Sequence, residues 1–79
     1  MIETIALIVA GGRGARAGDG VPKQYRNIGG KPMLRHVLEI FTAHTEIDAV
    51  QVVIHPDDDA LYQTASRGLP VNPPVYGGV

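Results

Sequence analysis

A parallel α/β fold in three layers is predicted by three features of this 79-residue sequence. Two continuous apolar runs, at residues 4–10 and 49–55, are rich in β-branched side chains and are typical of buried parallel strands. Between them, apolar residues recur at helical spacing from residue 33 to residue 41. This strand–helix–strand order favours right-handed crossovers, which make the strands parallel and cover the sheet with helices.

The first predicted element is the run TIALIVA, Thr4–Ala10, which we expect to be a strand buried on both faces. A glycine-rich loop follows it. The segment YRNIGGKP then predicts a short extended piece with a turn at Gly29-Gly30. Pro32 suits the first position of a helix, where its missing N–H leaves no bond unmade. This helix is expected to run for about three turns and to end near His44.

The second half of the chain repeats the strand–helix pattern. Ala49–His55 is predicted to be the second strand, and a helix is expected around Ala60–Arg67 before Gly68 stops it. The segment VNPPVYGGV predicts a third short strand at an edge of the sheet, because Pro73 and Pro74 cannot donate ladder hydrogen bonds. Ligands of parallel sheets bind beyond the carboxyl ends of the strands, so a functional site is expected there.

Composition excludes several classes of protein. With 44% hydrophobic residues, 19% charged residues and a net charge of −1, the sequence does not favour binding to nucleic acid or to an anionic membrane. The absence of cysteine excludes disulfides and thiolate metal sites, and no apolar stretch reaches the roughly 20 residues of a membrane span. We therefore expect a cytoplasmic protein. A chain of this length buries only a modest core, so we expect it to be a segment of a longer protein.

The stretch AGGRGARAGDGVPKQY, residues 10–25, suggests phosphate binding, because glycines let backbone N–H groups approach an anion closely. Its GRGARA part matches the residue types of the dinucleotide-binding pattern. That pattern must also open a helix, and we expect none before Pro32, so this class is excluded. A P-loop is excluded because Lys23 is followed by Gln24. The remaining interpretation is a loop that wraps a triphosphate, with Arg16 and Lys23 as cations that stabilise a phosphoryl transition state.

The residues LIVAGGRGARAGDGVPKQYRNIGGKPMLRHVLEIF closely resemble the start of the 2-C-methyl-D-erythritol 4-phosphate cytidylyltransferases of the non-mevalonate isoprenoid pathway. The resemblance is close over Ile5–Phe41 and covers Val50–Gly78 in pattern only. Its specific part is the sequence PKQY, whereas the loop before it is shared by nucleotidyltransferases in general. Gly11 and Ala17 depart from the family pattern, which more often has alanine and methionine at these positions.

The resemblance implies a Rossmann-like nucleotidyltransferase fold, of which residues 1–79 are the N-terminal, CTP-binding portion. It implies that the 4-phosphate of methylerythritol phosphate attacks the α-phosphorus of CTP and releases pyrophosphate. Arg16 and Lys23 match the catalytic cations. The residues that match the nucleotide-binding positions are Ala10, Gly11, Gly12, Arg13, Gly14, Gly77 and Gly78.

The resemblance also implies partners and a cofactor. Mg²⁺ is expected to bridge the phosphates, with its protein ligand beyond residue 79 and no metal ligand in this chain. The full-length enzyme is expected to be a homodimer. In some bacteria members of this family are fused to the cyclodiphosphate synthase of the same pathway, so a second domain is left open.

Two alternatives to this function remain at this point. Polyol-phosphate cytidylyltransferases, such as those acting on ribitol 5-phosphate, more often read PKQF, so Tyr25 favours the methylerythritol enzyme. A chain that ends at Val79 is better described as a nucleotide-binding fragment without catalysis.

Two further patterns have simpler structural interpretations. The run HPDDD, residues 55–59, contains metal-ligating residue types, but we expect Asp57 to cap the following helix and Asp58 and Asp59 to complement its dipole. His36 is expected to pair with Glu39 or to contact a neighbouring loop rather than to act as a base.

Overall fold

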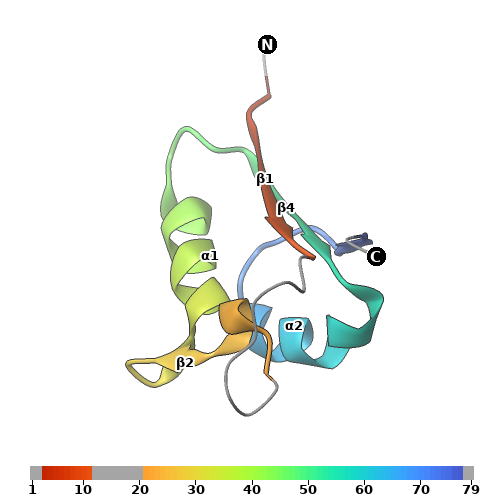
Figure 1. Cartoon of the computed structure of the whole chain (residues 1–79). Helices are drawn as coiled ribbons and strands as arrows, with labels where there is room; N and C mark the ends of the chain where they lie inside the picture. Colours follow the sequence, from red (N-terminus) through yellow and green to blue (C-terminus); the bar gives the residue numbers. More distant parts are fainter. Residues whose placement is uncertain (1–2, 12–20, 78–79) are drawn as a thin grey trace.

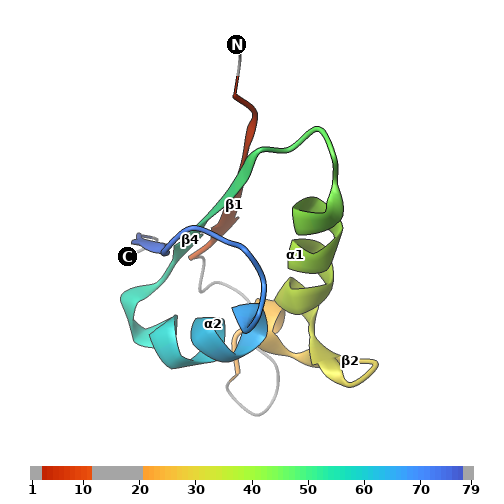
Figure 2. The same cartoon turned by 180° about the vertical axis from the view of Figure 1, so that it is seen from behind.

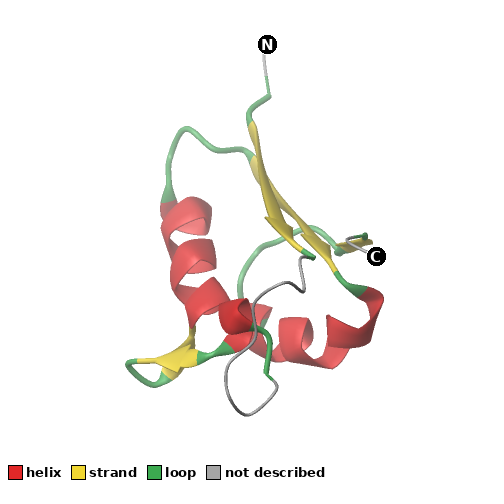
Figure 3. Ribbon diagram, viewed as in Figure 1, coloured by secondary structure: helices red, strands yellow, loops and turns green. Residues whose placement is uncertain are grey.

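The structure, a computed structural model, describes residues 3–11 and 21–77. Three parallel strands form a sheet in the order β1-β4-β5, and the short strands β2 and β3 form a separate hairpin (Figures 1 and 3). The strands are β1 (Ile5–Ala10), β2 (Asn27–Ile28), β3 (Lys31–Pro32), β4 (Ala49–Ile54) and β5 (Val75–Tyr76). The helices are α1 (Met33–Ala43) and α2 (Asp59–Ser66), with 3-10 turns η1 (Lys23–Tyr25) and η2 (Pro56–Asp58).

The pairing of β1 with β4 confirms the predicted parallel sheet. The two strands align from Ile5 opposite Ala49 to Ala10 opposite Ile54, so their carboxyl ends are level. β5 pairs with the carboxyl half of β4 and lies at the edge of the sheet, where its preceding prolines were expected to place it. All three strands therefore end at one edge of the sheet.

Both helices lie on the same face of this sheet (Figures 1 and 2). Each helix connects neighbouring parallel strands. In the order β1-β4-β5, each later strand is added on the same side of the strand before it. Right-handed crossovers in a sheet that grows in one direction place every helix on one face. The α/β fold class is confirmed, and the described residues supply two of the three expected layers.

The expectation that β1 is buried on both faces is wrong within the described residues. Ile5, Leu7 and Val9 are 53%, 64% and 71% exposed, whereas Ala6, Ile8 and Ala10 face the helices. The side chains on both faces of β1 are apolar, which makes the apolar run continuous. The helices, however, cover only the face of Ala6, Ile8 and Ala10. On the covered face, the side chains of Val52 and Ile54 in β4 are fully buried.

The β2–β3 hairpin fixes where α1 begins. The predicted turn is confirmed, since Gly29 and Gly30 have φ values of 61° and 86°, which are the positive angles of a tight two-residue hairpin turn. Pro32 ends β3 with a ψ of 144° and caps α1 without belonging to it. The prediction that the helix begins at Pro32 is therefore wrong by one residue, because Pro32 pairs with Asn27 in the hairpin.

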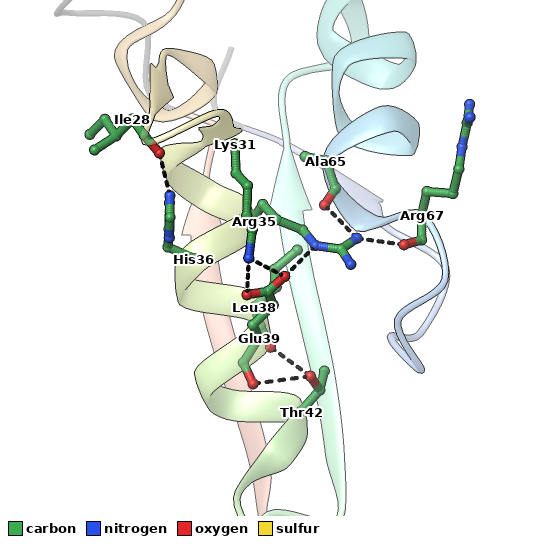
Figure 4. Close-up of polar contacts among 9 residues, drawn as sticks. All are labelled: Ile28, Lys31, Arg35, His36, Leu38, Glu39, Thr42, Ala65 and Arg67. Carbon is green, nitrogen blue, oxygen red and sulfur yellow. Dashed lines mark hydrogen bonds and ion pairs between the residues drawn. The ribbon is translucent and has the colours of Figure 1, made fainter.

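Arg35 joins the two helices (Figure 4). Its guanidinium donates hydrogen bonds to the backbone carbonyls of Ala65 and Arg67 at the end of α2, where a helix leaves carbonyls unpaired. Its Nε also donates to Glu39, 2.9 Å away, and Lys31 binds the same carboxylate. These hydrogen bonds, first from Arg35 and then from Lys31, hold the pKa of Glu39 below its ordinary value.

The end of α2 is set by Gly68, whose φ of 80° is the left-handed conformation that commonly terminates helices. This confirms the predicted stop. Among the described residues, neither helix combines the length and the apolar character needed to cross a bilayer.

The buried face of α1 makes a testable prediction about stability. Leu38 is 0% exposed and Ile40, on the same helix, is 66% exposed. Leu38→Ala is expected to lower the free energy of unfolding by about 3 kcal/mol, because it removes buried methyl groups and leaves a cavity. Ile40→Ala should cost less than about 1 kcal/mol, as measured by chemical denaturation. Equal losses for the two variants would contradict this assignment of the core.

Candidate functional site

Residues predicted to bind a nucleotide gather at the carboxyl edge of the sheet. Ala10 ends β1 and is 7% exposed, and Gly11 after it is also buried. Gly77 follows β5, and its N–H donates to the carbonyl of Ile54 at the end of β4. The structure therefore places Ala10, Gly11 and Gly77 at the carboxyl ends of β1 and β5, on either side of β4, as expected. The other predicted site residues lie outside the described residues: Gly12, Arg13, Gly14, Arg16 and Gly78.

Gly77 is required by close packing at this edge. A Cβ atom on Gly77 would lie 3.0 Å from Cγ1 of Val53, which is tighter than ordinary van der Waals contact. The chain therefore passes over β4 at a distance that only glycine allows without displacing Val53. This close approach keeps the backbone at the end of β5 beside the end of β4.

In the segment PKQY, Lys23–Tyr25 form a single 3-10 turn that packs against α1 and α2. Pro22 precedes the turn with a φ of −55°, and the N–H of Tyr25 donates to the Pro22 carbonyl at 2.9 Å. We expected no helical turn before Pro32, and η1 corrects that expectation. The turn has three residues, too few for the helix that a dinucleotide-binding loop requires, so the exclusion of that class is unaffected.

Within this turn, Lys23 is exposed while its neighbours are held. Pro22 is buried, and Tyr25 is 4% exposed within the hydrophobic core. Gln24 donates a hydrogen bond from Nε2 to the carbonyl of Ala10, 2.6 Å away. The expected packing of Tyr25 and hydrogen bonding of Gln24 are confirmed, and the expectation that they hold the lysine stays a prediction.

The charge of Lys23 is available to an anion. No acidic side chain in the described part of the chain forms an ion pair with it, in contrast to Lys31, which binds Glu39. The turn that carries Lys23 is tied to the end of β1 by Gln24. Among the described residues, the positive charge of Lys23 is therefore free to attract a phosphate.

The prediction for HPDDD is confirmed in part. Asp58 and Asp59 stand at the N-terminus of α2, as expected to complement its dipole, but the N-cap of α2 is Asp58, so the expected cap by Asp57 is wrong. The Nδ1 atom of His55 accepts a hydrogen bond from the Asp57 N–H at 3.0 Å, so His55 caps the preceding turn η2. Asp58 is buried at the start of α2, and Asp59 accepts a hydrogen bond from the Tyr76 hydroxyl at 2.8 Å. Histidine is an unusual capping residue, and for that reason sequence analysis did not select it.

Residues 3–11 and 21–77 contain no cluster of side chains that could hold a metal ion. No group of three or more His, Asp or Glu side chains comes together there. Asp57 points to solvent with 78% of its side chain exposed, while Asp59 is engaged by Tyr76. These residues do not fit a Mg²⁺ site by themselves.

His36 contacts a loop, which is one of the two roles expected for it. Its Nε2 lies 2.6 Å from the carbonyl of Ile28 in the hairpin (Figure 4), and a carbonyl only accepts, so His36 donates. The other expectation, a pair with Glu39, is wrong because Arg35 and Lys31 occupy that carboxylate.

Two cavities border these elements. One, of about 270 Å³, lies beside the end of β1 and is lined by Ala10, Gln24 and apolar residues of β1 and α1. A larger one, of about 560 Å³, lies between α2 and the segment before β5. No predicted site residue lines the larger cavity, so the chemistry of the chain does not point there.

Comparison with known proteins agrees with this geometry. Residues 4–78 match the family model described as "IspD: 2-C-methyl-D-erythritol 4-phosphate cytidylyltransferase". The chain belongs to this family. Its parallel sheet with helices is consistent with an α/β nucleotidyltransferase fold.

Curated relatives carry the name "Bifunctional enzyme IspD/IspF". The protein from Paramagnetospirillum magneticum is 50% identical over 78 residues, which are 99% of this chain and 20% of the relative. Those from Bradyrhizobium diazoefficiens and Rhodopseudomonas palustris are 49% and 51% identical, each over 96% of this chain and 19% of the relative. The chain thus spans about a fifth of the length of these relatives.

The contact at Gly77 predicts a coupled effect on stability. Gly77→Ala is expected to lower the free energy of unfolding by about 1 kcal/mol, because its methyl group presses on Val53. In a Val53→Ala background, which removes Cγ1, the same substitution should cost less. A double-mutant cycle measured by denaturant unfolding reports the coupling. Additive effects would show that the two residues do not press on each other.

The bond from Tyr76 to Asp59 predicts a titration. Donation to the carboxylate raises the pKa of Tyr76 above 10. A raised pKa means that the bond contributes stability below about pH 10 and that this contribution is lost as the pH rises through the folded-state pKa. Asp59→Asn should lower the pKa of Tyr76, followed by NMR of labelled tyrosine. Asp57→Asn serves as the matched control, and an equal shift in both variants would contradict the assignment.

Proposed function

We propose that the protein to which this chain belongs transfers CMP from CTP to 2-C-methyl-D-erythritol 4-phosphate and releases pyrophosphate. The observation that carries this proposal is the exposed Lys23, which forms no ion pair with the residues that the structure describes and lies on a turn bonded to the carboxyl end of β1. The family match and the names of the relatives support the choice of substrates.

In the proposed reaction, a phosphate oxygen of the acceptor forms a bond to the α-phosphorus of CTP. The bond from that phosphorus to the oxygen bridging to the β-phosphate breaks, and pyrophosphate leaves with the electron pair. Negative charge accumulates on the oxygens around the α-phosphorus in the transition state. Lys23, together with Arg16 as the resemblance implies, stabilises this charge.

The nucleotide is proposed to lie across the ends of the strands. The buried backbone at Ala10 and Gly11 and the close approach at Gly77 offer peptide groups rather than side chains at this edge. Peptide groups provide donors and acceptors in fixed directions, which suits recognition of a base edge. The glycines Gly12, Gly14 and Gly78 and the cation Arg13 are proposed to complete the nucleotide site.

The cofactor and the assembly are further parts of the proposal. Mg²⁺ is proposed to neutralise the triphosphate, with protein ligands from outside the described residues. A cytoplasmic homodimer is proposed for the whole enzyme. Relatives named as bifunctional support the idea that the rest of the protein carries a second activity.

The proposal predicts the kinetics of a Lys23 variant in the whole protein. Lys23→Ala is expected to lower kcat by about 10²-fold or more, since a preorganised transition-state charge contact is lost. Arg16→Ala should act similarly. The control is Lys31→Ala, which removes a cation bound to Glu39 and should leave kcat within about twofold. The measurement is pyrophosphate release from CTP with methylerythritol phosphate.

Two outcomes would contradict parts of this proposal. A Lys23 variant in which only KM changes would show that the lysine serves ground-state binding instead of the transition state. Faster turnover with ribitol 5-phosphate than with methylerythritol phosphate would assign the protein to polyol-phosphate chemistry. Absence of pyrophosphate release with either acceptor would reject the cytidylyltransferase function.

A further inference from the structure

Gln24 makes a contact that joins two parts of the site. Its side-chain amide donates from Nε2 to the backbone carbonyl of Ala10 at 2.6 Å, across 14 positions of sequence. Ala10 is the last residue of β1, and Gln24 follows Lys23 within η1. One hydrogen bond therefore connects the carboxyl end of the strand to the turn that carries the cation.

Gln24 supplies the side-chain contact from the turn to β1, whereas the backbone directly after the turn is bonded to α1, where the Met33 N–H donates to the Arg26 carbonyl at 2.9 Å. Pro22 and Tyr25 are buried, and burial of apolar surface is a non-directional force. Packing therefore fixes how deeply the turn sits in the protein. A hydrogen bond to a carbonyl has a preferred distance and angle, so it also fixes how the turn is oriented toward the strand.

The orientation of this turn decides where the ammonium group of Lys23 can reach. Lysine has a flexible four-carbon stem, and its position depends on where its backbone is anchored. The adjacent residue on one side is a buried proline, and the adjacent residue on the other side is bonded to β1. The lysine backbone is thus held from both sides while its side chain remains exposed.

We propose that Gln24 is a positioning residue, which holds Lys23 in reach of the α-phosphate through its hydrogen bond to the Ala10 carbonyl. This inference rests on the proposed function. Gln24 acts through Lys23 and needs no contact with CTP. The contact requires a donor at position 24, because the carbonyl oxygen of Ala10 can only accept.

The test compares two glutamines in the whole protein. Gln24→Leu removes the donor with little change of volume. Gln51→Leu is the matched control, because Gln51 in β4 donates to the Pro73 carbonyl at 2.9 Å, away from the carboxyl edge. Gln24→Leu deletes one hydrogen bond to a backbone carbonyl, and Gln51→Leu deletes the bond to Pro73 together with a longer one to the Val52 carbonyl at 3.3 Å. Gln51→Leu is therefore expected to lower the melting temperature by at least as much as Gln24→Leu.

The kinetic readout separates positioning from stability. Gln24→Leu is expected to lower kcat by about 10- to 100-fold, because a catalytic group is displaced, with the KM for CTP within about threefold of wild type. Gln51→Leu should leave kcat within about twofold. An unchanged kcat in Gln24→Leu, or an equal loss in both variants, would overturn the inference.

A second variant gives a pH signature that a purely structural role would not produce. In Gln24→Glu, the ionised carboxylate cannot donate to the Ala10 carbonyl, whereas the protonated acid can. The ratio of its kcat to that of wild type is therefore expected to rise as the pH falls from about 8 to about 5.5. The same ratio for Gln24→Leu should stay flat. A flat ratio for Gln24→Glu would contradict the proposed hydrogen bond.

Failure of this inference differs from failure of the proposed function. If wild type turns over CTP and Gln24→Leu does so equally, the positioning role is rejected and the function stands. If wild type does not turn over CTP, the function is rejected, and the positioning role is rejected with it.

The contact itself is measured separately, as a scalar coupling across the hydrogen bond between Nε2 of Gln24 and the carbonyl carbon of Ala10. Absence of that coupling would remove the basis of the inference.

Discussion

The parallel pairing of β1 with β4 is the constraint on which the other features depend. Because the two strands are in register to their last residues, the segments that leave them start from the same edge. The close approach of Gly77 to Val53 and the bond from Gln24 to Ala10 are both made at that edge. A slip of one residue would turn Val52 and Ile54 away from the helices and bring Val53 inward, so the core and the site are fixed by one register.

The hydrophobic pattern was sufficient to predict the elements, because their periodicity reflects which side chains are buried. The helix of residues 33–43 and both long strands were predictable in this way, and the turn was predictable from the glycine pair Gly29-Gly30. Burial of β1 was not, since it depends on the order of the strands in the sheet. Local sequence contains no information on whether the next strand is added on one side or the other, and that choice decides which face receives a helix.

The candidate site was predictable in its residue types and less so in its contacts. PKQY could be identified as the segment that carries the cation, and the roles of Gln24 and Tyr25 followed from their types. The contact of Asp59 was missed because it depends on a tertiary neighbour: Tyr76, whose hydroxyl donates to it, is 17 residues away in the sequence. In the same way, Glu39 was expected to pair with the nearby His36, but it binds the longer side chain of Arg35 instead.

The one-directional order of the strands also makes the two edges of the sheet unlike each other. The β5 edge is two residues long and follows a pair of prolines, which limits the backbone groups that it can offer to another strand. The β1 edge is six residues long, and its alternate side chains are aliphatic and exposed. A further strand would therefore extend this sheet beside β1. Strands added on that side reverse the direction in which the sheet grows, and right-handed crossovers then place their helices on the opposite face. Such helices would cover Ile5, Leu7 and Val9.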